Sequence, residues 1–171
     1  KCALVMHTQP VDENGTDLPA VIDAVASDCN IIFSEKRRLQ QELNWNYNLA
    51  DCTINIANNE GFGLATAESI MAGTPIIVNV TGGLQDQCGF DYCADDYIDI
   101  QTLHHKDTYG KTEHGEWAFP VWPSAINVNG SPVTPFIFDD RVNNDDVANS
   151  IYEVYNLGKS ERKSRGLKGR E

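Results

Sequence analysis

Two glutamates flank a glycine turn near the middle of this chain. The turn and its flanking carboxylates are formed by Glu60, Gly61, Phe62, Gly63, Leu64 and Glu68. Glycine has no Cβ, so the backbone of such a turn can approach a ligand closely and point bare N–H groups at it. The first amides of a helix lack intrahelical partners and carry the positive end of its dipole, which suits a phosphate. A carboxylate repels phosphate but accepts hydrogen bonds from two neighbouring hydroxyls, as on a ribose or a hexose. The stretch therefore predicts a ligand that combines phosphate with sugar hydroxyls, namely a nucleotide sugar.

The residues around the turn predict a strand, a helix and a second strand. Residues 51–57 are β-branched and apolar, which is typical of a buried strand, and residues 64–72 are good helix formers. Gly73 is expected to end the helix, and Pro75 precedes a second apolar strand at 76–80. Such a βαβ unit places the turn at the carboxyl end of a strand, where open α/β sheets bind ligands.

Taken together, these motifs resemble the donor site of retaining glycosyltransferases with the GT-B fold. The resemblance is carried by the two glutamates of the turn, by Ala72-Gly73-Thr74-Pro75 and by Gly82-Gly83-Leu84. It covers about residues 44–86, with a looser match of residues 160–170 to the closing helix of that family. The fold that it implies is α/β, a Rossmann-like parallel sheet flanked by helices that forms one lobe of a two-lobed enzyme.

The resemblance also implies a role for each residue of the turn. Glu68 is expected to hold the ribose hydroxyls of the nucleotide, and Glu60, the candidate catalytic residue, to contact the donor sugar near the reacting carbon. The donor-binding turn itself runs through Gly61, Phe62, Gly63 and Leu64, with the last three amides facing the diphosphate and sugar. The family's arginine and lysine that help to bind the diphosphate have no assigned counterpart in this chain.

We expect residues 1–171 to be the carboxyl-terminal donor-binding domain of such an enzyme, truncated at its amino-terminal end. The chain runs from Lys1 directly into an apolar stretch without an initiator methionine. Its partners would then be a nucleotide-sugar donor, an unknown acceptor and the missing amino-terminal lobe of the same protein. Because GT-B enzymes react in the cleft between two lobes, this fragment alone is expected to transfer nothing.

Other interpretations of the turn are open. Glycines often join a strand to a helix, and glutamates near a helix start can simply complement the dipole. An NAD site would need Gly or Ala where Thr66 stands and an acidic residue at the end of the next strand, and the sequence of a P-loop is not found. The alternative functions are a GT-B-fold sugar-nucleotide epimerase or phosphorylase, and a non-catalytic nucleotide-sugar-binding domain.

Composition limits the classes of partner. The chain has 171 residues, 41% of them hydrophobic, and a net charge of −12, which fits one globular domain and argues against nucleic acid. Residues 159–171 carry six Lys or Arg against two Glu, so this basic tail is a solvated helix face or contacts an acidic partner or a membrane surface. No apolar run approaches the ~20 residues of a membrane helix. The five cysteines are scattered and odd in number, which indicates a reducing, cytoplasmic location.

No residue pattern predicts a metal ion or another cofactor. The candidate ligands are the pairs Asp95-Asp96 and Asp139-Asp140 and the histidines His104, His105 and His114, with Asp107 and Glu113 nearby. Adjacent residues in a strand point to opposite faces, and the histidines match no standard zinc spacing. We therefore expect donor binding and transfer to be independent of metal, with helix amides stabilising the leaving diphosphate.

Further elements are expected on both sides of the turn. They are strands at 3–7 and 30–33, helices at 15–26, 35–48 (capped by Ser34) and 144–157, and a short strand at 135–138. The residues expected to face the core from the first and last of these helices are Leu18, Val21, Ile22 and Val25, and Val147, Ile151, Val154 and Tyr155. Alternation of strand and helix from residue 3 to 80 predicts one parallel sheet with right-handed crossovers. An irregular insertion is expected at 87–135, in which Trp117 and Trp122 pack rather than bind sugar.

Overall fold

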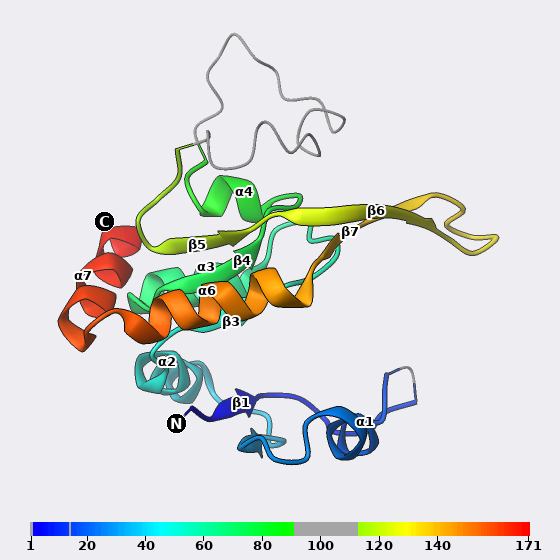
Figure 1. Cartoon of the computed structure of the whole chain (residues 1–171), viewed down its shortest axis with the longest axis horizontal. Helices are drawn as coiled ribbons and strands as arrows, with labels where there is room; N and C mark the ends of the chain where they lie inside the picture. Colours follow the sequence, from blue (N-terminus) through cyan, green and yellow to red (C-terminus); the bar gives the residue numbers. More distant parts are fainter. Residues whose placement is uncertain (1, 14, 91–112) are drawn as a thin grey trace, which may run out of the picture. The chain divides into compact units, whose positions relative to one another are not determined.

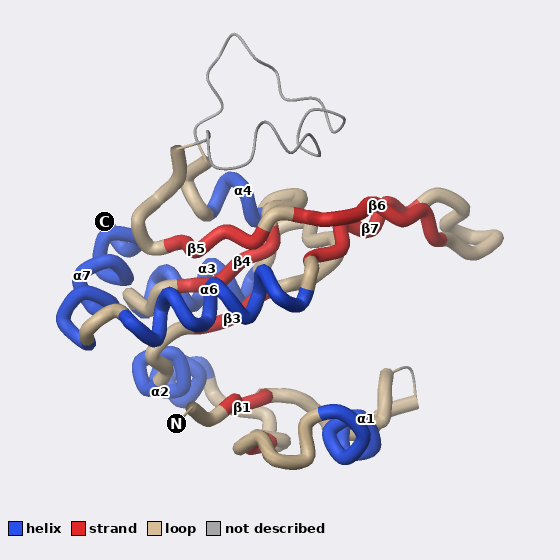
Figure 2. Tube along the Cα trace, viewed as in Figure 1, coloured by secondary structure: helices blue, strands red, loops and turns tan. Residues whose placement is uncertain are grey.

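The computed structural model describes residues 2–13, 15–90 and 113–171. The chain forms two compact units, Lys1–Gln40 and Gln41–Glu171, each with its own strands and helices (Figures 1 and 2). Parallel β-α-β units in small sheets flanked by helices confirm the α/β class that the sequence predicts.

The first unit is a single β-α-β unit. It consists of β1 (Leu4–Met6), α1 (Leu18–Val25) and β2 (Ile31–Phe33), with β1 and β2 parallel. The Asp17 side chain accepts a hydrogen bond from the Ala20 amide at 3.0 Å, so the helix begins at residue 18 rather than 15. The apolar face predicted for α1 is covered only in part, since Leu18 and Ile22 are half-buried whereas Val21 and Val25 are exposed.

Ser34 does not cap the next helix, contrary to the sequence prediction. Its amide donates to the Met6 carbonyl at 2.9 Å, and its hydroxyl lies 3.1 Å from His7 Nδ1. Both polar groups of Ser34 are therefore engaged by the β1 segment. The following helix, α2 (Gln40–Leu49), begins five residues later than the predicted start at Glu35.

The second unit is built on a three-stranded parallel sheet. Its strand order is β3-β4-β5, with β3 (Thr53–Asn55), β4 (Ile76–Asn79) and β5 (Ala118–Val121). α3 (Leu64–Ala72) connects β3 to β4, with the bounds that the sequence predicts. Gly73 ends α3 with a left-handed φ of 76° and donates its N–H to the carbonyls of Ser69 and Ile70, as a glycine C-cap does.

The core lies on both faces of β4. Ile76, Val78 and Val80 belong to one buried cluster, with Leu84 of α4 (Leu84–Gln87) packed in it. Ile77 points to the other face, where it meets β5 and helix α6 (Asn144–Asn156). The alternation of side chains along a strand explains how one short strand supports two clusters. Trp117 and Trp122 pack against the first cluster, which confirms their predicted packing role.

Two expectations about the sheet are wrong. The single sheet expected from residue 3 to 80 is found as separate sheets, β1-β2 and β3-β4-β5, among the described strands. The expected irregular insertion at 87–135 contains β5, which pairs in parallel with β4 and contributes to both core clusters. Pro120 is tolerated in β5 because this strand lies at the edge of the sheet.

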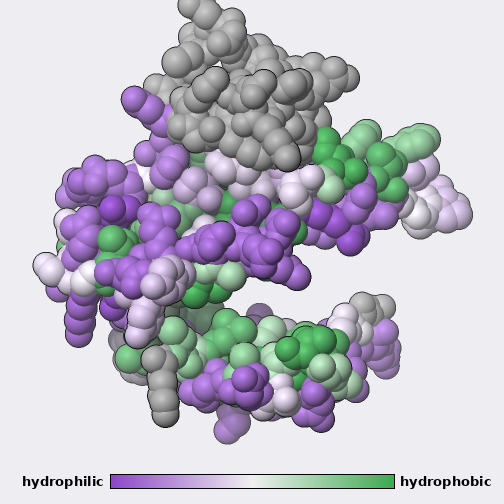
Figure 3. Space-filling view, viewed as in Figure 1, coloured by the Kyte–Doolittle hydropathy of each residue, from purple (hydrophilic) through white to green (hydrophobic). Residues whose placement is uncertain are grey.

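An antiparallel hairpin follows β5. It is formed by β6 (Pro123–Asn129) and β7 (Ile137–Val142), and we call residues 123–142 the arm. The arm extends beyond the three-stranded sheet and the helices of the second unit (Figure 1). Green, hydrophobic side chains gather over one side of its outer half in the space-filling view (Figure 3).

The last two helices pack on the second unit. Val154 of α6 is buried and Val147 and Ile151 pack beside it, as predicted, but Tyr155 is exposed. In α7 (Lys159–Arg170), Gly166 is buried against the end of α3, where a Cβ would stand 2.1 Å from the Gly73 carbonyl oxygen. The close approach of α7 to the end of α3 therefore requires a glycine at this position.

The acidic body of the protein is itself a partner for the basic tail. Arg162 pairs with Asp51 at 2.9 Å, and Arg165 lies 5.4 Å from the centre of the Phe119 ring. Lys168 pairs with Glu116 and lowers the pKa of that carboxyl. These contacts hold α7 against the second unit, so part of its charge is used within the chain.

Candidate functional site

The turn between β3 and α3 has the geometry that needs glycine at one position. Gly63 is the residue before the helix and has a left-handed φ of 81°. A Cβ at this position would stand 2.5 Å from Leu84 Cδ2 and 3.2 Å from Glu60 Cγ. Backbone conformation and packing therefore both select glycine here.

A second glycine loop, after β4, interlocks with the first. The Gly83 amide donates to the Glu60 carbonyl at 3.0 Å. A Cβ at Gly82 would stand 2.2 Å from that carbonyl oxygen, and one at Gly83 would stand 2.1 Å from the Gly61 oxygen. Glu60 is thus positioned through its main chain by the loop after the neighbouring strand.

Gly61 differs from the other three glycines of these two loops. A Cβ at this position would meet nothing within 4 Å, and its φ is not among the positive values of the chain's described glycines. Neither strain nor packing within the described chain requires glycine at position 61. The space beside it is open to an incoming molecule.

The backbone amides of Phe62, Gly63 and Leu64 also indicate that a molecule can bind beside the turn. Within the described part of the chain, none of these three amides has a hydrogen-bond partner. Further along the helix, the amides of Thr66 and Ala67 both donate to the Gly63 carbonyl at 3.0 Å. Three free donors at the start of a helix form an anion-binding geometry.

Glu68 lies on the exposed surface of α3, about one turn from its start. The Tyr47 hydroxyl of α2 donates to Glu68 Oε2 at 2.8 Å. Burial, and then the hydrogen bond and negative charge of Glu68, raise the pKa of Tyr47. Tyr47 is held in turn by Thr74, whose hydroxyl donates to the Tyr47 carbonyl at 2.7 Å.

The contacts of the two carboxylates are different. Glu60 is half-buried beside Gly63 and Gly82, whereas Glu68 accepts a hydrogen bond from Tyr47. No described contact joins the two glutamates. Tyr47 is not among the residues for which the sequence predicts a role. Its partnership with Glu68 depends on how α2 packs near α3, which no local pattern encodes.

Polar side chains under the turn connect it to the sheet. Asn55 Nδ2 donates to the buried Thr66 hydroxyl at 3.0 Å, and Thr53 Oγ1 lies 2.6 Å from the buried Ser69 hydroxyl. Asn79, fully buried at the end of β4, donates from Nδ2 to the Ala57 carbonyl at 2.8 Å. These bonds fix α3 along β3, and the loop before α3 at the carboxyl end of β4.

Asn79 also links the site to the arm. Its Nδ2 donates to the Asp140 carbonyl at 2.8 Å, and the Thr81 hydroxyl donates to the Asp140 carboxylate at 2.7 Å. Asn79 Oδ1 is buried without a hydrogen-bond partner in the described chain. A buried acceptor of this kind is normally satisfied by water or a ligand.

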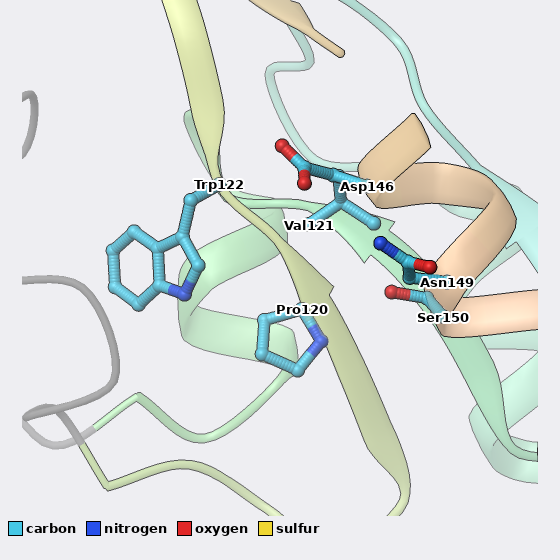
Figure 4. Close-up of a pocket in the computed structure, with 6 residues that line it drawn as sticks. All are labelled: Pro120, Val121, Trp122, Asp146, Asn149 and Ser150. Carbon is cyan, nitrogen blue, oxygen red and sulfur yellow. The ribbon is translucent and has the colours of Figure 1, made fainter. Parts of the chain in front are cut away.

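A surface hollow of about 270 Å³ lies elsewhere, between the end of β5 and the first turns of α6 (Figure 4). Its lining is formed by Pro120, Val121, Trp122, Asp146, Asn149 and Ser150. The indole of Trp122 points away from Asn149 and Ser150 in Figure 4 and packs edge-on to Phe90, with ring centres 5.8 Å apart. The hollow therefore offers no aromatic platform for a sugar, and it does not contain the glycine turn.

The described residues contain no group of three potential metal ligands. Asp139 pairs with Asn129 and Arg141, whereas Asp140 accepts from Thr81, so the two neighbouring carboxylates are used separately. Five further candidates lie outside the described residues; they are Asp95, Asp96, His104, His105 and Asp107. Metal independence therefore stays a prediction.

No protein family model matches this chain, and no curated protein matches it. Among the described helices, none has the length and apolar character needed to cross a membrane.

Proposed function

We propose that this chain is the nucleotide-sugar-binding lobe of a retaining glycosyltransferase with the GT-B fold. The proposal rests on the resemblance around the glycine turn. It is supported by the position of this turn at the carboxyl ends of two parallel strands, which is where α/β sheets bind ligands.

The observation that carries the proposal is that the amides of Phe62, Gly63 and Leu64 have no hydrogen-bond partner within the described residues. They lie at the start of α3, next to the open space at Gly61. A diphosphate would receive these three donors and the positive end of the helix dipole. Because the interlocked loops already hold the turn, little ordering would be needed on binding.

Glu68 is proposed to bind the two ribose hydroxyls of the nucleotide. A ribose diol donates two hydrogen bonds, and a carboxylate has two oxygens to accept them. Tyr47 already occupies one lone pair of Oε2 and so orients the carboxylate toward its ligand. Tyr47 is thus proposed as a positioning residue, acting through Glu68.

Glu60 is proposed to contact hydroxyls of the donor sugar near the reacting carbon. Its main chain is fixed by Gly83, so its carboxylate can orient the sugar relative to the diphosphate bound at the amides. The acceptor is then proposed to attack from the face that the diphosphate leaves, which retains the anomeric configuration. The amides and the helix dipole stabilise the charge of the departing diphosphate, without a metal ion.

The intact parent protein tests the proposal. We expect UDP, GDP or ADP, or one of their sugars, to raise its melting temperature. A ligand at 100 times its Kd stabilises by about 2.7 kcal/mol, which corresponds to roughly 5–11 °C for a domain of this size. The isolated chain is expected to bind more weakly and to transfer nothing.

Product analysis distinguishes the classes of enzyme. Transfer of a sugar with retained configuration supports the proposal. Interconversion of the free donor selects an epimerase, and cleavage by phosphate selects a phosphorylase. If no nucleotide or nucleotide sugar binds at all, the amides of the turn do not form a donor site.

A further inference from the structure

The arm has two faces of opposite character. Directly opposed residues of an antiparallel pair lie on the same face, and Val128 is opposite Phe138. Ile126 lies on this face too, two residues before Val128, and Phe136 stands two residues before Phe138. At its inner end the face reaches Asp140, which is opposite Ile126 and accepts a hydrogen bond from the Thr81 hydroxyl. All four apolar side chains are exposed, with Phe136 at 78% and Val128 at 57%.

The opposite face of the arm is more polar, although it includes the partly exposed Ile137. It carries Asn127 and Asn129 of β6, which lie opposite Asp139 and Ile137 of β7. The Asn129 side chain donates a hydrogen bond to the Asp139 carboxylate. This face is suited to water, whereas the apolar face has no layer packed over it among the residues that the structure describes.

The arm needs further packing to be stable. β6 and β7 form a two-stranded sheet by themselves among the described strands. Among the described residues, β7 is tied to the rest of the second unit by the bond from the Asp140 amide to the Asn58 carbonyl at 2.7 Å and by that from Asn59 Nδ2 to the Phe138 carbonyl at 3.2 Å. Isolated two-stranded hairpins are marginally stable in water, and packing against another layer stabilises them.

We infer that the apolar face of the arm packs against the same face of a second copy of this chain. Residues 123–138 contain no Asp, Glu, Lys or Arg, although the whole chain has a net charge of −12. Two copies that approached through their acidic surfaces would repel each other, whereas the uncharged arms meet without that cost. A face that contacts its own copy forms an isologous dimer, the commonest symmetric assembly.

The exposed area is adequate for such a dimer. Phe136 and Phe138 are 78% and 53% exposed, which corresponds to roughly 260 Å² of aromatic surface. Ile126, Val128 and, at the tip, Val133 add roughly 180 Å². Because interfaces are about 57% apolar, the sum corresponds to roughly 800 Å² per copy, the usual size of a specific interface.

The test compares Val128→Lys with Asn127→Lys in the full chain. Both variants add one positive charge to the same strand, on the apolar and on the polar face respectively. Sedimentation velocity from about 1 to 200 µM should show a concentration-dependent dimer for the wild type and for Asn127→Lys. Val128→Lys should weaken the dimer by at least tenfold, because the ammonium group would be buried in an apolar contact.

Phe136→Ser provides a second variant at a side chain that is even more exposed, so its folding is preserved. It should also weaken the dimer, with an unchanged far-UV circular dichroism spectrum. A wild type that is monomeric at every concentration would overturn the inference, as would equal effects of Val128→Lys and Asn127→Lys. Binding of the monomer to vesicles of neutral lipid would likewise show that the arm's occupant is a membrane and not a second copy.

Discussion

The two interlocked glycine loops give opposite predictions for two Gly→Ala substitutions that are chemically identical. In Gly83→Ala, the new Cβ would stand 2.1 Å from the Gly61 carbonyl oxygen, so the loops must separate. In Gly61→Ala, the new Cβ meets nothing within 4 Å and the backbone is not left-handed. The first change is expected to destabilise the protein and the second is not.

The expected magnitudes follow from these contacts. Overpacking against a fixed backbone costs about 1–3 kcal/mol, and separation of the loops also weakens the bond from the Gly83 amide to the Glu60 carbonyl. At roughly 2–4 °C per kcal/mol, Gly83→Ala should lower the melting temperature by about 2–12 °C. Gly61→Ala restricts the unfolded chain and should stabilise by about 0.4–1 kcal/mol, or about 1–4 °C.

Thermal unfolding followed by circular dichroism measures both effects without any knowledge of the ligand. Donor binding by calorimetry on the parent protein then tests the site. Gly61→Ala should lower affinity without any loss of stability, because its methyl group enters the space proposed for the donor. If Gly83→Ala melts at the wild-type temperature, or if Gly61→Ala destabilises as much as Gly83→Ala, the two loops do not interlock through these glycines.

Three further predictions concern the parent protein and this chain. Glu68→Gln should weaken nucleotide binding about 10- to 150-fold, since a charged hydrogen-bond partner contributes roughly 1.5–3 kcal/mol. Calorimetry should show a smaller loss for Tyr47→Phe, and equal nucleotide binding by the wild type and both variants would exclude the ribose role of Glu68. Donor binding and transfer by the parent protein should persist in EDTA, and loss of activity that Mn²⁺ or Mg²⁺ restores would contradict metal independence. Burial raises the pKa of Cys88 to about 12, so this thiol should resist iodoacetamide at pH 8 in the folded chain. The exposed Cys2 and Cys29 should react, and mass spectrometry of the labelled peptides measures the difference. Equal labelling of the three cysteines would place Cys88 at the surface.

The local elements of the site were determined by the sequence alone. The bounds of α3, its glycine C-cap and the following strand β4 agree with prediction, because propensity and capping act within a few residues. The left-handed Gly63 at the start of α3 likewise fits the predicted glycine turn. Helix starts were less well predicted, since the hydroxyl of Ser34 lies beside His7 rather than at a helix end.

Only the tertiary structure decided how these elements meet. β5 was missed because its proline and aromatic residues resemble a loop, and only its pairing with β4 makes it a strand. Gly82 and Gly83 contribute to the family resemblance in the sequence. The structure shows why a side chain cannot stand there: each glycine packs against a carbonyl oxygen, of Glu60 and Gly61 respectively, more than twenty residues earlier in the sequence. Tyr47 reaches Glu68 across a similar separation. Side-chain type and spacing encode a local conformation, whereas contacts between distant segments depend on the packing of the whole sheet. The glycine turn was therefore predictable from the sequence, and the contacts of its two glutamates were not.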